Sequence, residues 1–134
     1  MVSRNPSLAF VAMINAHDLD GLVRLMASDY VFIDSLGEVH SRPGIEEGWR
    51  QYFEMVPDYW IKVERTVREG NTVILVGRAG GTFVPNRGVA RPENAWETPA
   101  VWVARTRGGK VAEWRVYSDN EPIRQRMRRN KQRS

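Results

Sequence analysis

The sequence contains no cysteine and only two histidines, His17 and His40. The first absence excludes disulfides, thiol nucleophiles and Cys-based zinc sites. The two histidines lie far apart and no Glu/His spacing motif accompanies them, so we expect no metal site and no cofactor. No run of about 18 apolar residues is present, and the first six residues lack the apolar core of a signal peptide. We therefore expect no membrane association and a cytoplasmic location.

Acidic residues are missing from the last twelve positions. Residues 123–134 hold six of the 20 Lys and Arg residues, so residues 1–122 carry 14 basic and 16 acidic groups, although the whole chain has a net charge of +4. Such a basic segment could contact nucleic acid or an anionic surface. No aromatic residue is interleaved with its arginines, which makes nucleic-acid binding an unfavoured reading. We expect a single domain over residues 1–122 and a flexible, solvated tail over residues 123–134.

The first half of the chain is mainly helical in pattern. Asn5-Pro6 is typical of an N-cap followed by proline at the first helical position. Apolar residues at helical spacing predict helices over about residues 6–16, 19–27 and 43–55. A short strand over residues 30–34 and a brief return strand from Val39 separate the second helix from the third.

The second half of the chain is predicted to be a sheet. Strands are predicted over about residues 59–66, 72–83, 96–105 and 110–119, the last two joined at Gly108-Gly109. An odd-length loop with a glycine bulge would put the even-numbered residues of both strands on one face, whereas a strict two-residue turn would put Trp102 opposite Arg115. That face mixes large apolar residues with small or polar ones, which favours a cavity lining. Helices followed by a mostly antiparallel sheet indicate the α+β class.

Four features occur together: Asn15-Ala16-His17-Asp18-Leu19-Asp20 between two short helices, a strand ending in Asp34, a helix containing Trp49 ahead of Pro57-Asp58, and the closing strand 109–119. In combination they resemble the nuclear transport factor 2-like superfamily, and more closely its SnoaL-like and ketosteroid isomerase-like branch. The resemblance covers about residues 6–122. It implies a strongly curved sheet wrapped as a cone around three helices of the N-terminal half, an apolar internal cavity, and commonly a homodimer.

The resemblance also implies roles for individual residues. Asp34 falls where ketosteroid isomerases place their general-base aspartate, while their two oxyanion-holding acids fall on Phe10 and Trp102. Arg78 matches the arginine of limonene-type epoxide hydrolases. Asp119 lies near the acid that SnoaL-type cyclases carry on the last strand, which makes it a possible second acid.

Asp34 is the candidate catalytic base. Tyr30 and Phe32, on the same side of its strand, should point into the cavity, and desolvation there should raise the pKa of Asp34. The alternative is that Asp34 caps the following turn through backbone N–H groups. His40, on the return strand, is a possible partner of Asp34, or else an exposed hairpin histidine.

The other candidate site residues are ones that could bind a substrate. Their alternative is a core role, or, for Arg78, an ion pair with Glu113 or Asp119. The candidates are Phe10, Tyr30, Phe32, Trp49, Tyr52, Arg78, Trp102, Trp114, Val116 and Ser118.

Together these features predict a small-molecule-binding protein with a hydrophobic ligand. It would be an isomerase, cyclase or lyase that uses Asp34 as general base on a hydrophobic carbonyl compound, without metal. The alternative is a non-catalytic ligand-binding or dimerisation module of the same fold. Val101 and Val103, on the outward side of the hairpin, join the apolar run 73–76, so we expect a homodimer through the convex sheet face.

Overall fold

Helices and strands alternate in the first half of the chain, and strands dominate the second. The computed structural model describes residues 5–85 and 88–132. Its helices are α1 (Pro6–Ala16), α2 (Leu19–Leu25), α3 (Ile45–Met55), α4 (Glu121–Gln132) and the short 3-10 helix η1 (Pro92–Asn94). Its strands are β1 (Met26–Ile33), β2 (Val39–Ser41), β3 (Trp60–Glu69), β4 (Thr72–Thr82), β5 (Ala95–Arg107) and β6 (Lys110–Ser118).

Local capping explains the first two helices. The Asn5 side chain accepts a hydrogen bond from the Ser7 N–H at 3.0 Å, and the Asp18 side chain accepts one from the Gly21 N–H at 2.9 Å. His17 ends α1 in the left-handed conformation, with φ of 53°. The predicted bounds of the first helix are confirmed. The second helix ends three residues before Ser28, because the chain from Met26 already pairs with β6 as strand β1.

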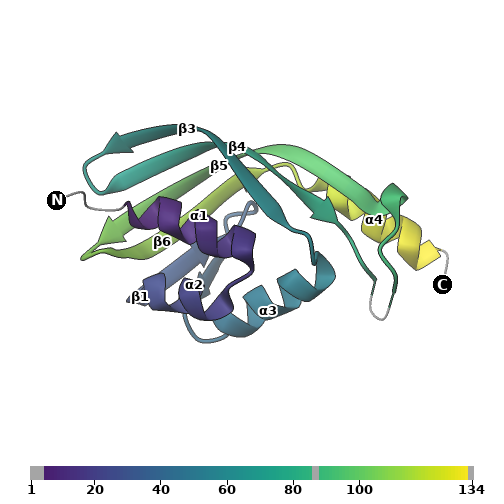
Figure 1. Cartoon of the computed structure of the whole chain (residues 1–134), viewed down its shortest axis with the longest axis horizontal. Helices are drawn as coiled ribbons and strands as arrows, with labels where there is room; N and C mark the ends of the chain where they lie inside the picture. The colour runs from purple at the N-terminus through teal and green to yellow at the C-terminus, as the bar shows by residue number, and fades with distance from the viewer. Residues whose placement is uncertain (1–4, 86–87, 133–134) are drawn as a thin grey trace.

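The six strands form one curved sheet in the order β2-β1-β6-β5-β4-β3. The β1–β6 pair is parallel and the other pairs are antiparallel. Helices α1, α2 and α3 lie on the concave side of the sheet (Figure 1). The predicted α+β class, with a curved, mostly antiparallel sheet around three helices of the N-terminal half, is confirmed.

The hairpin between β5 and β6 keeps its even-numbered residues on one face, as expected, but the extra residue lies in a strand and not in the loop. Gly108 and Gly109 form a two-residue turn with φ of 58° and 76°, and Arg107 pairs with Lys110 across it. A register shift after Arg105 adds one residue on β6, so Trp102 faces Val116 instead of Arg115. The bulge lies in the strand, because the Gly-Gly pair fits the tight turn that matches strand twist.

A second bulge bends the sheet where β3 pairs with β4. The pairing shifts between Val63 and Arg65, opposite Gly77. A Cβ atom at Gly77 would lie 1.8 Å from the carbonyl oxygen of Lys62. The lack of a side chain therefore allows the two backbones to approach, and the bulge increases the local twist that curves the sheet over the helices.

Two clusters of buried side chains hold the elements together. The larger joins α1, α2 and the concave face of the sheet, with Phe10, Tyr30, Trp102 and Trp114 each at most 1% exposed. The smaller consists of Val56, Phe83, Trp96 and Ile123. No helix within the described residues is long and apolar enough to span a membrane.

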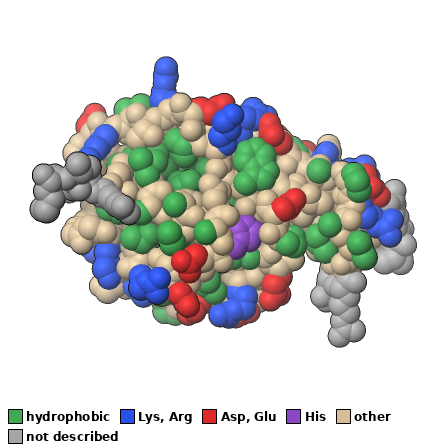
Figure 2. Space-filling model, in the orientation of Figure 1, with side chains coloured by type: hydrophobic (Ala, Val, Ile, Leu, Met, Phe, Trp, Pro, Cys, Tyr) green, Lys and Arg blue, Asp and Glu red, His purple; other side chains and the backbone are tan. Residues whose placement is uncertain are grey.

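The C-terminal segment, predicted to be a flexible tail, is a helix in the structure. Residues 121–132 form α4, and Ile123 is 8% exposed because it packs into the smaller cluster, with Met127 beside it. Arg126 donates to the carbonyl oxygen of Ala95 at 3.0 Å, and Arg129 to that of Glu93 at 3.2 Å. Acidic and basic side chains are interspersed over the face shown in Figure 2.

Candidate functional site

A cavity of about 590 Å³ lies between the concave face of the sheet, the β1–β2 turn and α3. Ser41, Pro43, Gly44 and Gly48 line it and are exposed, so the cavity opens between β2 and the start of α3. We call this opening the mouth. The full lining is Phe32, Asp34, Ser35, His40, Ser41, Pro43, Gly44, Ile45, Gly48, Trp49, Tyr52, Tyr59, Ile61, Ala79, Trp96, Thr98, Ala100, Trp102, Trp114, Val116, Ser118 and Asn120.

The cavity wall is largely aromatic and aliphatic. Trp96, Trp102 and Trp114 come from β5 and β6, and Trp49 comes from α3. Small residues, Ala79 and Ala100, leave the space that the tryptophans enclose. A volume and lining of this kind suit a small, mostly apolar organic molecule.

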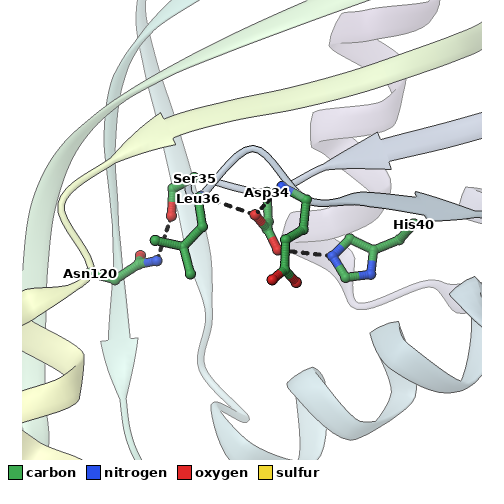
Figure 3. Close-up of polar contacts among 6 residues, drawn as sticks. Asp34, Ser35, Leu36, His40 and Asn120 are labelled. Atoms are coloured by element: carbon green, nitrogen blue, oxygen red, sulfur yellow. Dashed lines mark hydrogen bonds and ion pairs between the residues drawn. The ribbon is translucent and has the colours of Figure 1, made fainter.

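Asp34 lies at the mouth, directly after β1, and its carboxylate accepts three hydrogen bonds. Oδ1 accepts from the backbone N–H of Leu36 at 2.9 Å and from that of Glu38 at 3.0 Å. Oδ2 lies 2.8 Å from His40 Nε2 (Figure 3). Asp34 therefore caps its turn, and it also lines the cavity, while its role as general base stays a prediction.

The pKa of Asp34 moves in the opposite direction to the one we expected. Burial acts to raise the pKa, but the hydrogen bonds from His40 and from the N–H groups of Glu38 and Leu36 outweigh it, so the pKa lies below its ordinary value of 3.8. The pKa differs from the expected direction because the turn places N–H donors on the carboxylate. Asp34 is thus a carboxylate anion at neutral pH.

His40 is fixed by this anion and by an aromatic neighbour. Its ring stacks on Phe32, with 5.6 Å between the ring centroids and 28° between the planes. An ionised carboxylate can only accept hydrogen bonds, so His40 Nε2 must carry the shared hydrogen. Nδ1 is then the ring nitrogen that can accept a proton.

A second polar group at the mouth involves Ser35, Ser118 and Asn120. Asn120 Nδ2 donates to Ser35 Oγ at 2.6 Å, which ties the end of β6 to the β1–β2 turn (Figure 3). Ser118 Oγ lies 3.4 Å from Asn120 Oδ1. Because Ser35 Oγ accepts from Asn120, its own hydrogen can be donated into the cavity.

Asp34, Glu38 and His40 are the described residues that could hold a metal ion. One ligand atom from each lies within 4.8 Å of the others. Binding an ion there would compete with the Asp34–His40 hydrogen bond, and Glu38 is exposed. The absence of a metal site stays a prediction, and the turn that carries Glu38 is what brings this residue close to the Asp34–His40 pair.

Eight of the predicted site residues other than Asp34 line the cavity. They are Phe32, His40, Trp49, Tyr52, Trp102, Trp114, Val116 and Ser118. Two others, Phe10 and Tyr30, lie in the core behind it and are both 0% exposed. Phe10 packs against Trp114 with 4.7 Å between centroids, so it supports the wall without reaching the space. Burial raises the pKa of Tyr30, with the Trp49 side chain opposing this.

Arg78 and Asp119 also lie outside the cavity lining. Arg78 points to the convex face, where it pairs with Glu97 on the neighbouring strand, not with Glu113 or Asp119 as we considered. Asp119 is exposed and accepts a hydrogen bond from the Glu121 N–H at 2.9 Å, at the start of α4. Strand parity and helix capping account for these positions, which do not fit the substrate-contacting roles predicted for them.

Some lining residues were missed because no local pattern singles them out. Tyr59 precedes β3, and its carbonyl oxygen is bonded by His17 Nε2 at 2.8 Å. The Asn15 side chain holds Ile61, near the start of β3. It accepts a hydrogen bond from Ile61 N at 2.7 Å and donates one to Ile61 O at 2.9 Å. The Asn15–His17 segment that suggested the family resemblance thus fixes part of the cavity wall. Asn15 and His17, two polar residues spaced two apart at the end of α1, are the sequence feature that could have indicated these contacts.

Comparison with known proteins identifies the family of the chain. Residues 8–114 match the family model for the SnoaL-like domain. No curated protein sequence gives a significant match.

Several solved structures share the fold. AclR from Streptomyces galilaeus, a proposed hydroxylase, has 22% identity and a TM-score of 0.76, with 92% of this chain and 93% of that chain covered. IdmH from Streptomyces antibioticus, a proposed polyketide cyclase, has 23% identity and a TM-score of 0.76, with 92% and 96% covered. A protein from Catenulispora acidiphila with a ketosteroid isomerase-like fold, in complex with trimethylamine, has 19% identity and a TM-score of 0.70, with 87% of this chain and 86% of that chain covered. At these identities the likeness establishes the fold.

Proposed function

The chain belongs to the SnoaL-like domain family, and we propose that it transfers a proton at a carbon next to the carbonyl group of a hydrophobic small molecule. Membership of this family supports a small-molecule-binding function of cyclase or isomerase type. The observation that carries the finer proposal is the Asp34–His40 pair in the wall of an apolar cavity.

The two residues of the pair have different roles. Asp34 holds the ring of His40 and fixes the hydrogen on Nε2, and its negative charge stabilises the imidazolium that forms when Nδ1 takes a proton. Asp34 Oδ2 also keeps one lone pair free beside the His40 bond, whereas Oδ1 is fully used by the turn. His40 is therefore the proton carrier and Asp34 its orienting partner.

The reaction needs no external oxidant or water. The C–H bond next to the carbonyl breaks, its proton moves to His40 Nδ1, and the electron pair becomes an enolate. Where the enolate is conjugated with a neighbouring C=C bond, return of the proton to the far carbon of that bond shifts the double bond and gives an isomer. Attack of the enolate carbon on a second carbonyl of the same molecule forms a C–C bond, and the proton then goes to the new alkoxide, which is a cyclisation.

The proposal is tested by deuterium exchange into β-tetralone, a hydrophobic ketone with acidic hydrogens beside its carbonyl. In D₂O the wild type should accelerate exchange above the buffer rate, as followed by proton NMR. Asp34→Asn should fold and lower the enzyme-dependent rate by roughly 10²–10⁴-fold, because the amide cannot stabilise the imidazolium.

The matched control is Asp119→Asn, the same chemical change at an exposed carboxylate outside the cavity. Its exchange rate should equal that of the wild type, since asparagine also caps helices. Equal rates in wild type and Asp34→Asn would contradict the proposal.

A non-catalytic ligand-binding module is the second candidate. It is favoured by the residues at the two oxyanion positions, since Phe10 has no polar group and the Trp102 side chain is 1% exposed. Ligand-induced thermal stabilisation without any exchange would support this candidate.

A further inference from the structure

Two tyrosines of the cavity wall have no role in the Asp34–His40 chemistry. Tyr52 comes from α3, and Tyr59 lies between α3 and β3. Their rings meet edge to face, with 4.9 Å between centroids and 90° between planes. Within residues 5–85 and 88–132, neither hydroxyl makes a hydrogen bond to another residue.

Both tyrosines line the cavity. Among the described residues, three fully buried side-chain polar atoms have no hydrogen-bond partner: Tyr30 Oη, Trp96 Nε1 and Arg115 Nε. The hydroxyls of Tyr52 and Tyr59 are not among these buried atoms. A hydroxyl taken from bulk water without a replacement partner costs about 1–3 kcal/mol. An acceptor atom inside the cavity would offset this cost for both groups.

Both tyrosines are held in place by neighbours. His17 bonds the backbone of Tyr59 and stacks on Phe53 at 4.3 Å between centroids. Tyr52 packs edge to face on Trp49, with centroids 6.5 Å apart. Because the surrounding contacts are made without the ligand, the donors need little reorganisation when an acceptor arrives.

The pair is uncharged, and the cavity wall around it offers no cationic Lys or Arg side chain. Burial raises the pKa of Tyr52, and burial together with the nearby Tyr52 phenol raises the pKa of Tyr59 well above the usual range. Both therefore stay protonated donors. No Lys or Arg occurs among the described residues that line the cavity, so a carboxylate or phosphate would be buried without a counter-charge. A neutral ketone or phenol oxygen suits the pair.

The pair and the Asp34–His40 dyad lie near opposite edges of the sheet. His40 lies on the edge strand β2, whereas Tyr59 leads into the other edge strand, β3. The tryptophans of β5 and β6 lie between these edges. A single ligand that contacts both groups presents one oxygen function to each of them.

We propose that Tyr52 and Tyr59 form a two-donor site for a neutral carbonyl or phenol oxygen of the ligand, opposite the Asp34–His40 pair. This inference rests on the proposed function, because it assigns the end of the same ligand that is remote from the reacting carbon. The ligand class is an uncharged, mostly apolar molecule that carries a carbonyl or phenol oxygen.

The test compares two probes of equal shape, fluorenone and fluorene, of which only the first has an oxygen. Binding is followed by quenching of the tryptophan fluorescence in wild type, Tyr52→Phe, Tyr59→Phe and the double variant. Loss of both donors should weaken fluorenone binding about 5- to 100-fold, the effect of two hydrogen bonds, and change fluorene binding less than about twofold. The infrared carbonyl band of fluorenone should move to lower wavenumber in the wild type and shift back in the double variant.

Tyr117→Phe is the control, since Tyr117 is 48% exposed on the convex face. A double variant that binds fluorenone as well as Tyr117→Phe does, with an unshifted carbonyl band throughout, would overturn the two-donor site. Fluorenone has no hydrogen on the carbons next to its carbonyl, so this test does not depend on proton transfer. A tyrosine-dependent fluorenone signal without β-tetralone exchange would leave the two-donor site standing and remove the proposed reaction. Failure of the wild type to bind fluorenone, with β-tetralone exchange intact, would overturn the two-donor site alone.

Discussion

The ionisation state of Asp34 is determined by the turn that directly follows it. The sequence predicted a carboxylate after an apolar strand, and hence desolvation, but three N–H donors hold it ionised. Turn capping is the alternative to catalysis in the sequence. In the structure, capping supplies the geometry that lets Asp34 orient His40, so the two readings are compatible.

The lowered pKa of Asp34 predicts a pH-dependent contribution to stability. The unfolded carboxyl, with a pKa near 3.8, binds more protons than the folded one as the pH falls past that value. The contribution is therefore fully present above 3.8 and is lost as the pH falls through the lower folded pKa. The difference in unfolding free energy between wild type and Asp34→Asn, from urea titrations, should be constant near neutral pH and shrink in acid. A difference that grows on acidification would contradict the assignment.

Residues on regular strands could be placed from the sequence, whereas residues at element ends could not. Trp102, Trp114, Val116 and Ser118 line the cavity because alternation puts them on one face. Parity also puts Arg78 on the other face, but its position in an otherwise apolar strand suggested a ligand contact. Three-dimensional closure of the sheet, which no local pattern contains, brings Tyr59 and Asn120 to the same wall.

At the scale of elements, strand bulges create the cavity. The β5–β6 bulge keeps Trp102 and Trp114 on the concave face, and the β3 bulge opposite Gly77 bends the sheet. The sequence indicated the hairpin and its glycines but placed the irregularity in the loop. Bulge positions depend on pairing across strands, so a single strand's sequence does not determine them.

Gly77→Ala tests the close approach of β3 and β4. The new Cβ would lie 1.8 Å from the Lys62 carbonyl oxygen, so backbone must move, and we expect a loss of roughly 1–3 kcal/mol or more in unfolding free energy. Gly48→Ala is the control in a helix, where no heavy atom lies within 4 Å and a gain of about 0.5–1 kcal/mol is expected. Urea unfolding checks both. A Gly77→Ala variant as stable as the wild type would show that the backbones are not in contact.

Helix α4 is the element that sequence reasoning missed. Its composition is dominated by arginine, and only Ile123 and Met127, four residues apart, supply an apolar stripe. That stripe is too short to predict a helix by periodicity alone. It is sufficient here because Val56, Phe83 and Trp96 form a surface that receives it.

For the whole molecule, we propose a homodimer through the convex face of the sheet. Ile74, Val76, Val101 and Val103 are half-buried there, with Tyr117 beside them. An apolar sheet face of this kind is typical of an interface.

Val103→Arg should convert the dimer to a folded monomer, because a guanidinium would be desolvated at the centre of the interface. Val89→Arg is the control, since Val89 is 73% exposed in the loop before β5. Native mass spectrometry at micromolar concentration measures the change. A monomeric wild type would refute the dimer.

The central claim is that Asp34 and His40 act as one proton-transfer unit at the mouth of the cavity. The most direct measurement is β-tetralone exchange by His40→Gln, Asp34→Asn and the double variant, side by side. Residues that act as a unit are non-additive, so the double variant should be no slower than the slower single variant. Losses that multiply in the double variant, or a His40→Gln variant as fast as the wild type, would contradict the claim.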